Sequence, residues 1–240
     1  MRVLAGTSGF SFKEWKGRFY PEKLPAARML AHYAERLPTV ELNNTFYRLP
    51  KPHVIDAWRS EVPPEFRFVL KASRRITHQH RLKEGCGEAV EFFLSTTARL
   101  EGQLGALLFQ LPPNMKKDQA RLEAFLELLP AGIPAAFEFR HPSWFEDDDV
   151  PGLLARREMG LVVSDLPDED GEALAPPERA LEHGASWGYL RLRADAYSDE
   201  ELAGWRARLE EASWSTAYVF FKHELDGPLL AGRFLAHGNG

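Results

Sequence analysis

The chain has 240 residues, 44% of them apolar and 27% charged, which is the composition of an ordinary soluble globular protein rather than a fibrous or disordered one. The net charge of −5 disfavours duplex nucleic acid and anionic membranes as partners. A single cysteine, Cys86, excludes an intrachain disulfide, and no apolar run approaches the roughly 20 residues of a membrane span or resembles a signal peptide, so we expect a cytoplasmic protein.

Eight short apolar runs predict strands along the chain. They cover residues 3–9, 39–47, 66–73, 105–111, 134–140, 161–166, 188–194 and 217–223. Their starts lie between 27 and 39 residues apart, a spacing typical of repeated βα units. Apolar residues at three- and four-residue steps predict amphipathic helices over 27–38, 53–62, 119–130 and 200–212. The acidic, proline-bearing connection over 167–184 predicts at most a short helix.

Strict alternation of eight strands with about eight helices predicts an α/β fold, a single (β/α)8 TIM-type barrel of eight parallel strands that forms one domain over residues 1–240. A closed barrel is favoured because it leaves no sheet edge. A doubly wound open sheet is the alternative. Such a sheet normally shows a glycine-rich phosphate turn after its first strand, and GTSGFS at 6–11 lacks the GxGxxG spacing.

The predicted strands carry different residues on their two faces. Side chains alternate along a strand, so Phe137 and Phe139 share one face while Glu138 and Arg140 share the other. The outer face of a barrel strand packs against helices and must be apolar. We therefore expect the phenylalanines outside and the charges inside, late in the strand, at the C-terminal mouth where active sites of such barrels lie.

The inward polar face of six strands supplies the candidate site. Its members are Glu41, Lys71, Gln110, Glu138, Arg140, Asp165 and Arg191. Asp165 belongs to this set because the run over 161–166 is expected to place Val162 outside and Val163 with Asp165 inside. These charges could simply pair with one another. However, burying ions costs several kcal/mol, so their convergence from six strands favours a ligand or catalytic site.

Motifs along most of the chain carry a family resemblance. They are GTSGFSFKEWKGRFYP at 6–21, VELNNTFYRLP at 40–50, FVLKASRRITH at 68–78, LLFQLPPN at 107–114, FEFRHPSWF at 137–145 and YLRLR at 189–193. In combination they resemble the YecE-like family, a (β/α)8-barrel family that is a domain of unknown function. The resemblance implies the fold and the place of the site, and it supplies no reaction. The eighth strand differs, because Lys222 and His223 stand where the family has paired asparagines.

Five residues are expected to carry catalysis, namely Glu138, Lys71, Glu41, Asp165 and His141. A carboxylate held among apolar walls could act as a general base. Lys71, desolvated beside another cation, could act as a base or as an imine-forming amine. His141 is expected to donate hydrogen bonds or to shuttle protons.

A second group is expected to bind the ligand, namely Arg140, Arg191, Gln110, Asn43, Thr45, Tyr47, His78, Trp15 and Lys222. The two arginines suit a carboxylate or a phosphate, because a guanidinium group can bind either in bidentate fashion. Three inward acids against three inward bases predict a small polar or anionic ligand. The aromatic loop over 10–21, which holds Trp15, predicts either a stacking wall over the mouth or packing on the rim.

No metal and no cofactor are expected. His78, His80 and His141 have no clear third ligand, and the neighbouring lysine and arginine side chains would repel a cation. Four other histidines fall on helical or exposed stretches and are interpreted as surface residues, namely His32, His53, His183 and His237.

We predict an enzyme with acid/base or lyase/hydrolase-type chemistry on a small polar or anionic substrate. One alternative is a nucleic-acid-binding or nuclease-like barrel that would contact backbone phosphates through five arginines, namely Arg140, Arg191, Arg74, Arg75 and Arg81. The other alternative is a non-catalytic small-molecule-binding protein.

Overall fold

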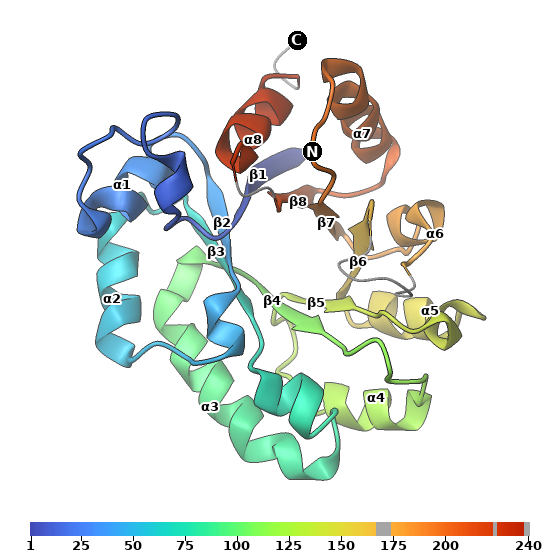
Figure 1. Ribbon diagram of the computed structural model, residues 1–240. Coiled ribbons are helices and arrows are strands. Elements are labelled where there is room, and N and C mark those ends of the chain that lie inside the picture. The colour runs from blue at the N-terminus through green and yellow to red at the C-terminus, as the bar shows by residue number, and fades with distance from the viewer. Residues whose placement is uncertain (167–173, 223–224, 238–240) are drawn as a thin grey trace.

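Eight parallel strands close into a barrel in sequence order in the computed structural model, which describes residues 1–166, 174–222 and 225–237 (Figure 1). The strands are β1 Arg2–Ser8, β2 Thr39–Leu42, β3 Arg67–Lys71, β4 Leu104–Gln110, β5 Ala135–Glu138, β6 Gly160–Ser164, β7 Trp187–Leu192 and β8 Thr216–Phe221. The eighth strand pairs with the first, so no sheet edge is left open. The predicted (β/α)8 TIM-type barrel is confirmed.

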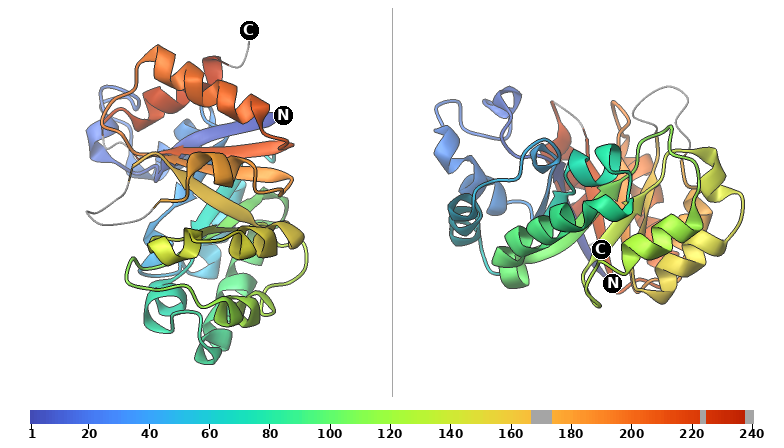
Figure 2. Two further views of the ribbon diagram at one scale, coloured as in Figure 1. Left: turned by 90° about the vertical axis from the view of Figure 1, so that its right-hand side faces the viewer. Right: turned by 90° about the horizontal axis from the view of Figure 1, so that it is seen from below.

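Helices follow the strands and cover the outside of the barrel (Figure 2). They are α1 Met29–Ala34, α2 Pro52–Glu61, α3 Gly87–Thr97, α4 Gln119–Leu126, α5 Asp149–Arg156, α6 Pro177–Leu181, α7 Asp199–Glu211 and α8 Gly227–Ala236. The four predicted helices are confirmed as α1, α2, α4 and α7, and the short helix as α6. Part of the predicted acidic connection, residues 167–173, lies outside the described residues. Among the residues that are described, no helix is long and apolar enough to cross a membrane.

An aromatic layer joins the strands to the helices, as predicted for the outer face. Phe137 stacks on Phe109 of β4 at a ring-centroid distance of 5.2 Å and meets Phe125 of α4 edge-on at 6.3 Å. Phe139 stacks on Trp144 at 4.4 Å. Such ring pairs add stability beyond their buried area. The outward phenylalanines therefore fix β5 and leave its alternate residues facing the barrel axis.

The barrel interior below the mouth is filled by side chains. A second apolar cluster contains Leu4, Val69, Ala106, Leu108, Ala136, Val162, Tyr189, Tyr218 and Phe220. It is separate from the larger cluster between strands and helices. Polar side chains at the ends of the strands therefore rest on a packed apolar floor, as in other barrels whose interiors are cores rather than pores.

The predicted faces of β6 are wrong. Val162 belongs to the interior cluster, and Val163 packs in the outer one. The strand begins at Gly160, where a Cβ atom would lie 3.2 Å from Trp187 and 3.4 Å from the Ala136 Cβ. The absence of a side chain at Gly160 leaves room for these two neighbours. The inward polar residue of β6 is consequently Ser164, and Asp165 follows the end of the strand.

His183 is buried rather than exposed, with 7% of its surface accessible, so the surface interpretation is wrong for this histidine. Its Nδ1 accepts a hydrogen bond from the backbone N–H of Ala185 at 3.3 Å. Burial lowers the pKa of the imidazole, and a hydrogen bond with the backbone of Met159 opposes that effect. The residue follows α6 in the chain and lines neither of the two cavities at the strand ends.

Candidate functional site

Glu138 lies at the centre of the mouth and is 3% exposed. Its Oε1 accepts from Arg140 Nε at 3.0 Å and from Arg193 at 2.8 Å, and its Oε2 accepts from Arg191 at 2.7 Å and from Gln110 Nε2 at 3.0 Å. Burial would raise the pKa of this carboxyl, but the three guanidinium groups outweigh burial and hold the pKa well below its usual range. Glu138 is therefore a fixed anion that aligns three arginines.

Glu41 is the second fixed anion and is fully buried. Its Oε1 accepts from Ser8 at 2.6 Å, from Asn43 Nδ2 at 2.9 Å and from Arg191 at 2.9 Å, and its Oε2 accepts from the Tyr189 hydroxyl. Burial opposes ionisation, but Arg191 and these donors lower the pKa of the carboxyl. Arg191 thus bridges the two carboxylates, and it faces inward as the alternation of residues in the seventh strand predicted.

Lys71 differs from the other charged groups because its side chain is only partly buried. Its amine donates to Gln110 Oε1 and lies 4.5 Å from the centroid of the Phe46 ring. Burial and the charge of Arg191 lower the pKa of the amine, the two carboxylates oppose them, and the resulting pKa is about 8. About a tenth of the amine is therefore unprotonated at pH 7, against less than roughly a thousandth for an ordinary lysine.

His78 lies beside Lys71 and reports the sign of the local field. Its ring meets Phe46 edge-on at 4.8 Å, and its Nδ1 lies 2.8 Å from the Thr77 hydroxyl. Burial, together with the nearby charges of Lys71 and Arg140, lowers the pKa of His78 to about 4, so the imidazole is neutral at pH 7. The residue sits on a π-helical turn over Arg75–Gln79, a conformation that recurs at functional sites.

The charge composition of the mouth differs from the predicted balance of three acids and three bases. Among the described residues, the hydrogen-bonded cluster contains two carboxylates, from Glu41 and Glu138, and four cationic side chains, from Lys71, Arg140, Arg191 and Arg193. Arg193 joins the cluster by donating to Glu138. Asp165 meets this cluster at its backbone, because its carboxylate accepts from the backbone N–H of Arg193 at 2.8 Å and from the Tyr197 hydroxyl.

Three other predicted site residues have mainly local contacts. The Thr45 hydroxyl lies 2.7 Å from the carbonyl oxygens of Leu42 and Lys71 and joins the ends of β2 and β3. His141 accepts at Nδ1 from the backbone N–H of Ser143 at 3.2 Å and so caps a short 3-10 helix. Tyr47 is 74% exposed on the rim. Catalysis by His141 and ligand binding by Thr45 and Tyr47 stay predictions.

Sequence reasoning left three neighbours of the carboxylates out of the site. Ser8 and Tyr189 both donate to Glu41, and Arg193 donates to Glu138. The signal for Arg193 was present, since it follows Arg191 by two residues in the run over 188–194, although β7 itself ends at Leu192. Ser8 ends β1 and pairs in register with Glu41. Tyr189 has an apolar ring that fits the interior cluster, and only the structure places its hydroxyl against Glu41.

Two small cavities lie where the loop after β1 meets the strand ends. One of about 210 Å³ is lined in part by Phe10, Phe12 and Trp58, and one of about 220 Å³ in part by Trp15 and Lys222. Trp15 is only 1% exposed, so the loop packs on the rim and also walls the second cavity. Lys222 is exposed, and its backbone N–H donates to Leu192 at 2.9 Å. His223, the other departure from the family pattern, lies outside the described residues.

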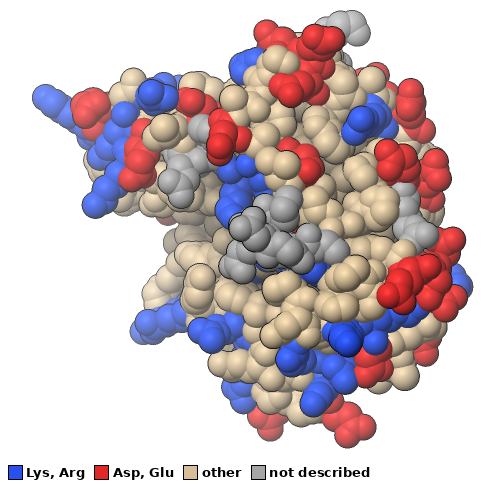
Figure 3. Space-filling model, turned by 45° about the vertical axis from the view of Figure 1, so that its right-hand side comes forward, with Lys and Arg blue, Asp and Glu red and all other residues tan. Residues whose placement is uncertain are grey.

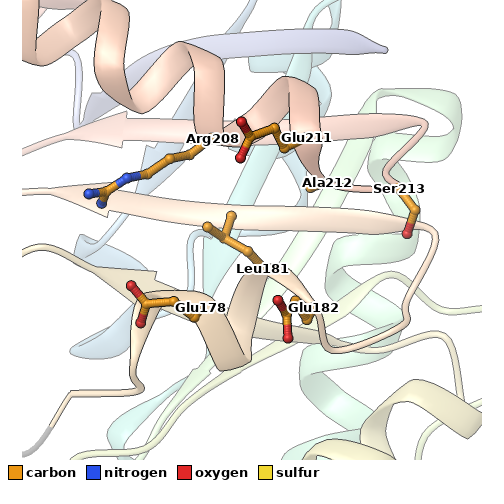
Figure 4. Close-up of a pocket in the computed structure, with 7 residues that line it drawn as sticks. All are labelled: Glu178, Leu181, Glu182, Arg208, Glu211, Ala212 and Ser213. Atoms are coloured by element: carbon orange, nitrogen blue, oxygen red, sulfur yellow. The ribbon is translucent and has the colours of Figure 1, made fainter.

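A larger hollow of about 480 Å³ lies in the outer helix layer, away from the mouth (Figure 4). Its walls come from α6 and from α7 with the residues that follow it, and they include Glu178, Glu182, Glu211 and Arg208. None of the mouth residues lines it. Three acids beside one arginine give this groove no arrangement that points to a particular ligand.

Charges of both signs lie on the face shown in Figure 3, with acidic side chains mainly at the top and right and basic ones along the lower half. Arg74 and Arg75 are exposed near the mouth, whereas Arg81 donates to Asn114. Nucleic-acid binding stays a prediction. Within the described part of the chain, no three histidine, cysteine, aspartate or glutamate side chains group closely enough to hold a metal ion.

Proteins of one family are similar to this chain. The family model described as "Protein of unknown function DUF72" matches residues 4–239. The UPF0759 protein YunF of Bacillus subtilis (strain 168) is 32% identical over 231 residues, which are 84% of this chain and 82% of that protein. The UPF0759 protein YecE of Escherichia coli (strain K12) is 36% identical over 141 residues, which are 57% of this chain and 52% of that protein, so the match spans about half of this relative.

Solved structures of the same family share the fold. A DUF72 family protein from Thermotoga maritima MSB8 has a TM-score of 0.85 at 29% identity, with all of both chains covered. A DUF72 family protein from Enterococcus faecalis V583 has a TM-score of 0.80 at 21% identity over 100% of this chain and 98% of that one.

Proposed function

The chain belongs to the family described as "Protein of unknown function DUF72", and from this premise and the geometry of the mouth we propose that it is an enzyme that acts on a small anionic substrate. Lys71 is the reacting group, either as a general base or as an amine that forms an imine with a carbonyl. The observation that carries the proposal is a partly exposed lysine whose pKa is lowered to about 8 beside a rigid layer of buried charges.

Lys71 suits acid/base chemistry better than the two carboxylates do. A general base works best when its pKa lies near the working pH. The pKa values of Glu41 and Glu138 are held low by guanidinium groups, so both carboxylates are weak bases that position arginines. Gln110 connects Lys71 to the buried carboxylates, because its Oε1 accepts from Lys71 while its Nε2 donates to Glu138. Lys71 is thereby held in place by the same fixed network.

An anionic substrate fits the positive field around the amine. The low pKa of His78 has the charges of Lys71 and Arg140 among its causes, so a proton is disfavoured there and an anion is favoured. If the substrate carries a carbonyl group, the neutral Lys71 nitrogen attacks the carbonyl carbon. The carbonyl oxygen leaves as water, and the nitrogen loses its protons as the C=N bond forms.

A panel of carboxylated and phosphorylated aldehydes, ketones and hydroxy acids tests the proposal. We expect conversion of at least one member, and Lys71→Met should lower kcat by at least about 100-fold. Lys51→Met is the matched control, because Lys51 is exposed at the start of α2 and should leave kcat unchanged. Equal turnover by Lys71→Met would remove Lys71 from the reaction. Tight binding of a panel member without any conversion would favour the non-catalytic binding protein.

A further inference from the structure

The two cavities beside β1 and β2 are parts of one recess. They share Ser8, Phe12 and Asn43 as lining residues, and their volumes are about 210 and 220 Å³. Each is smaller than the roughly 300–1,000 Å³ of most ligand sites, but together they reach that range. Their walls combine aromatic rings with hydroxyl and amide groups, and Lys222 lies at one edge.

The aromatic wall is held rigidly. Tyr20 donates its hydroxyl to the Phe10 carbonyl at 2.5 Å, and Trp15 accepts backbone hydrogen bonds from Phe19 and Tyr20 at 2.9 Å. Phe12 packs on Trp15 with ring centroids 4.7 Å apart. A wall that is already ordered costs a ligand little entropy on binding.

Gly9 allows the Phe12 ring to approach the backbone. Its φ of 113° lies in a region that L side chains rarely adopt, and a Cβ atom there would lie 2.7 Å from the Phe12 ring. The glycine therefore brings the ring against the loop, where it borders both cavities.

The recess adjoins the charged mouth. Ser8 and Asn43 line both cavities, and both also donate to Glu41. Leu42 pairs in register with Leu70, so the next residues, Asn43 and Lys71, follow on neighbouring strand ends. Neighbouring strands lie about 4.8 Å apart, which puts the recess within reach of a small molecule bound at the amine.

Asn43 indicates what the recess lacks. Its Nδ2 donates to Glu41, which fixes the orientation of the amide, and its buried Oδ1 accepts no hydrogen bond from the described residues. A ligand hydroxyl is a donor of the kind that this oxygen lacks. Aromatic faces such as Phe12 and Trp58 suit the C–H side of a ring, and Ser8 and Asn44 offer further partners for hydroxyl groups.

We propose that this recess takes the ring of a hydroxylated sugar whose phosphate group lies toward Lys71, so that the substrate class is a sugar phosphate. The inference rests on the proposed function, because it uses the same mouth for the anion. It adds a ring-binding half to that site, formed by the loop after β1.

Calorimetric titration with four probes tests the inference, namely inorganic phosphate, glucose 6-phosphate, ribose 5-phosphate and phenyl phosphate. At least one sugar phosphate should bind about tenfold more tightly than inorganic phosphate and more tightly than phenyl phosphate. Phe12→Ala should remove the tighter binding of the sugar phosphate relative to inorganic phosphate, while leaving the affinity for inorganic phosphate unchanged. Phe92→Ala, at an exposed phenylalanine of α3, is the control and should preserve the advantage.

The outcomes separate this inference from the proposed function. If inorganic phosphate and the sugar phosphates bind equally, the ring site is overturned and the anionic mouth survives. If phenyl phosphate binds most tightly, the recess is an aryl site and the sugar assignment is wrong. If no probe binds, the ring site fails together with phosphate binding at the mouth, and the carboxylated members of the activity panel then decide the proposed function. Should Phe12→Ala unfold, Trp58→Leu supplies the second test of the wall and should reduce the advantage of the sugar phosphate.

Discussion

Reductive alkylation with glyoxylate and cyanoborohydride should label Lys71 faster than any exposed lysine at pH 8. With a pKa of about 8, half of the Lys71 amine is unprotonated at that pH, whereas an ordinary lysine with a pKa near 10.4 is roughly 0.4% unprotonated. The reactive fraction is thus larger by about 100-fold. Lower basicity also reduces the intrinsic nucleophilicity of the amine, as it does for thiols, so we expect a net rate advantage of about tenfold.

Peptide mass spectrometry after digestion measures the labelling of each lysine across pH 6–11. Lys13 and Lys51 are exposed and serve as internal references within the same sample. The Lys71 rate should have a midpoint near pH 8, while the reference rates should rise until about pH 10. Equal rates at pH 8, together with a Lys71 midpoint above about pH 10, would refute the view that burial and Arg191 lower the pKa of this amine.

Three further results are expected. Glu138→Gln removes the anion shared by three buried arginines, so the free energy of unfolding measured with urea should decrease by about 3–5 kcal/mol. A decrease below about 1 kcal/mol would contradict the central position of Glu138. The folded-state pKa values of Glu41 and Glu138 lie below the unfolded value near 4.3, so the two ionised carboxylates stabilise the fold fully above that pH and lose this effect as the pH falls. As the pH is lowered from about 4.5, the melting temperature should therefore decrease, and it should decrease less steeply in Glu41→Gln. Gly9→Ala should lower the free energy of unfolding by about 1–3 kcal/mol, because Gly9 has a φ of 113° that alanine rarely adopts. Gly204→Ala, in open space on α7, should raise it by about 0.5–1 kcal/mol, and similar effects at both sites would count against strain at Gly9.

The barrel was predictable because its determinants are local. Residues alternate between faces in a strand and repeat at three- and four-residue steps in a helix, and both periods are visible in the printed sequence. The inward placement of Glu41, Lys71 and Glu138 followed from the same alternation. It failed in β6, where Val162 and Val163 are chemically alike and Asp165, the only charged residue of the run, lies beyond the strand.

Contacts across the barrel could not be read from any single strand. The hydrogen bonds from Gln110 to Glu138 and from Tyr189 to Glu41 depend on the register and tilt of several strands at once. The recess at Ser8 and Asn43 depends in addition on how the loop after β1 folds over the strand ends. From the sequence, only the aromatic content of this loop was visible. That content is compatible both with a stacking wall over the mouth and with packing on the barrel rim.

A crystal structure of the protein after reduction in the presence of glyoxylate tests the central claim most directly. We predict continuous electron density from Lys71 Nζ into the adduct, with Arg191 within hydrogen-bond distance of both Glu41 and Glu138. An unmodified Lys71 in a crystal whose exposed lysines carry the adduct, or an Arg191 side chain that contacts neither carboxylate, would contradict the account.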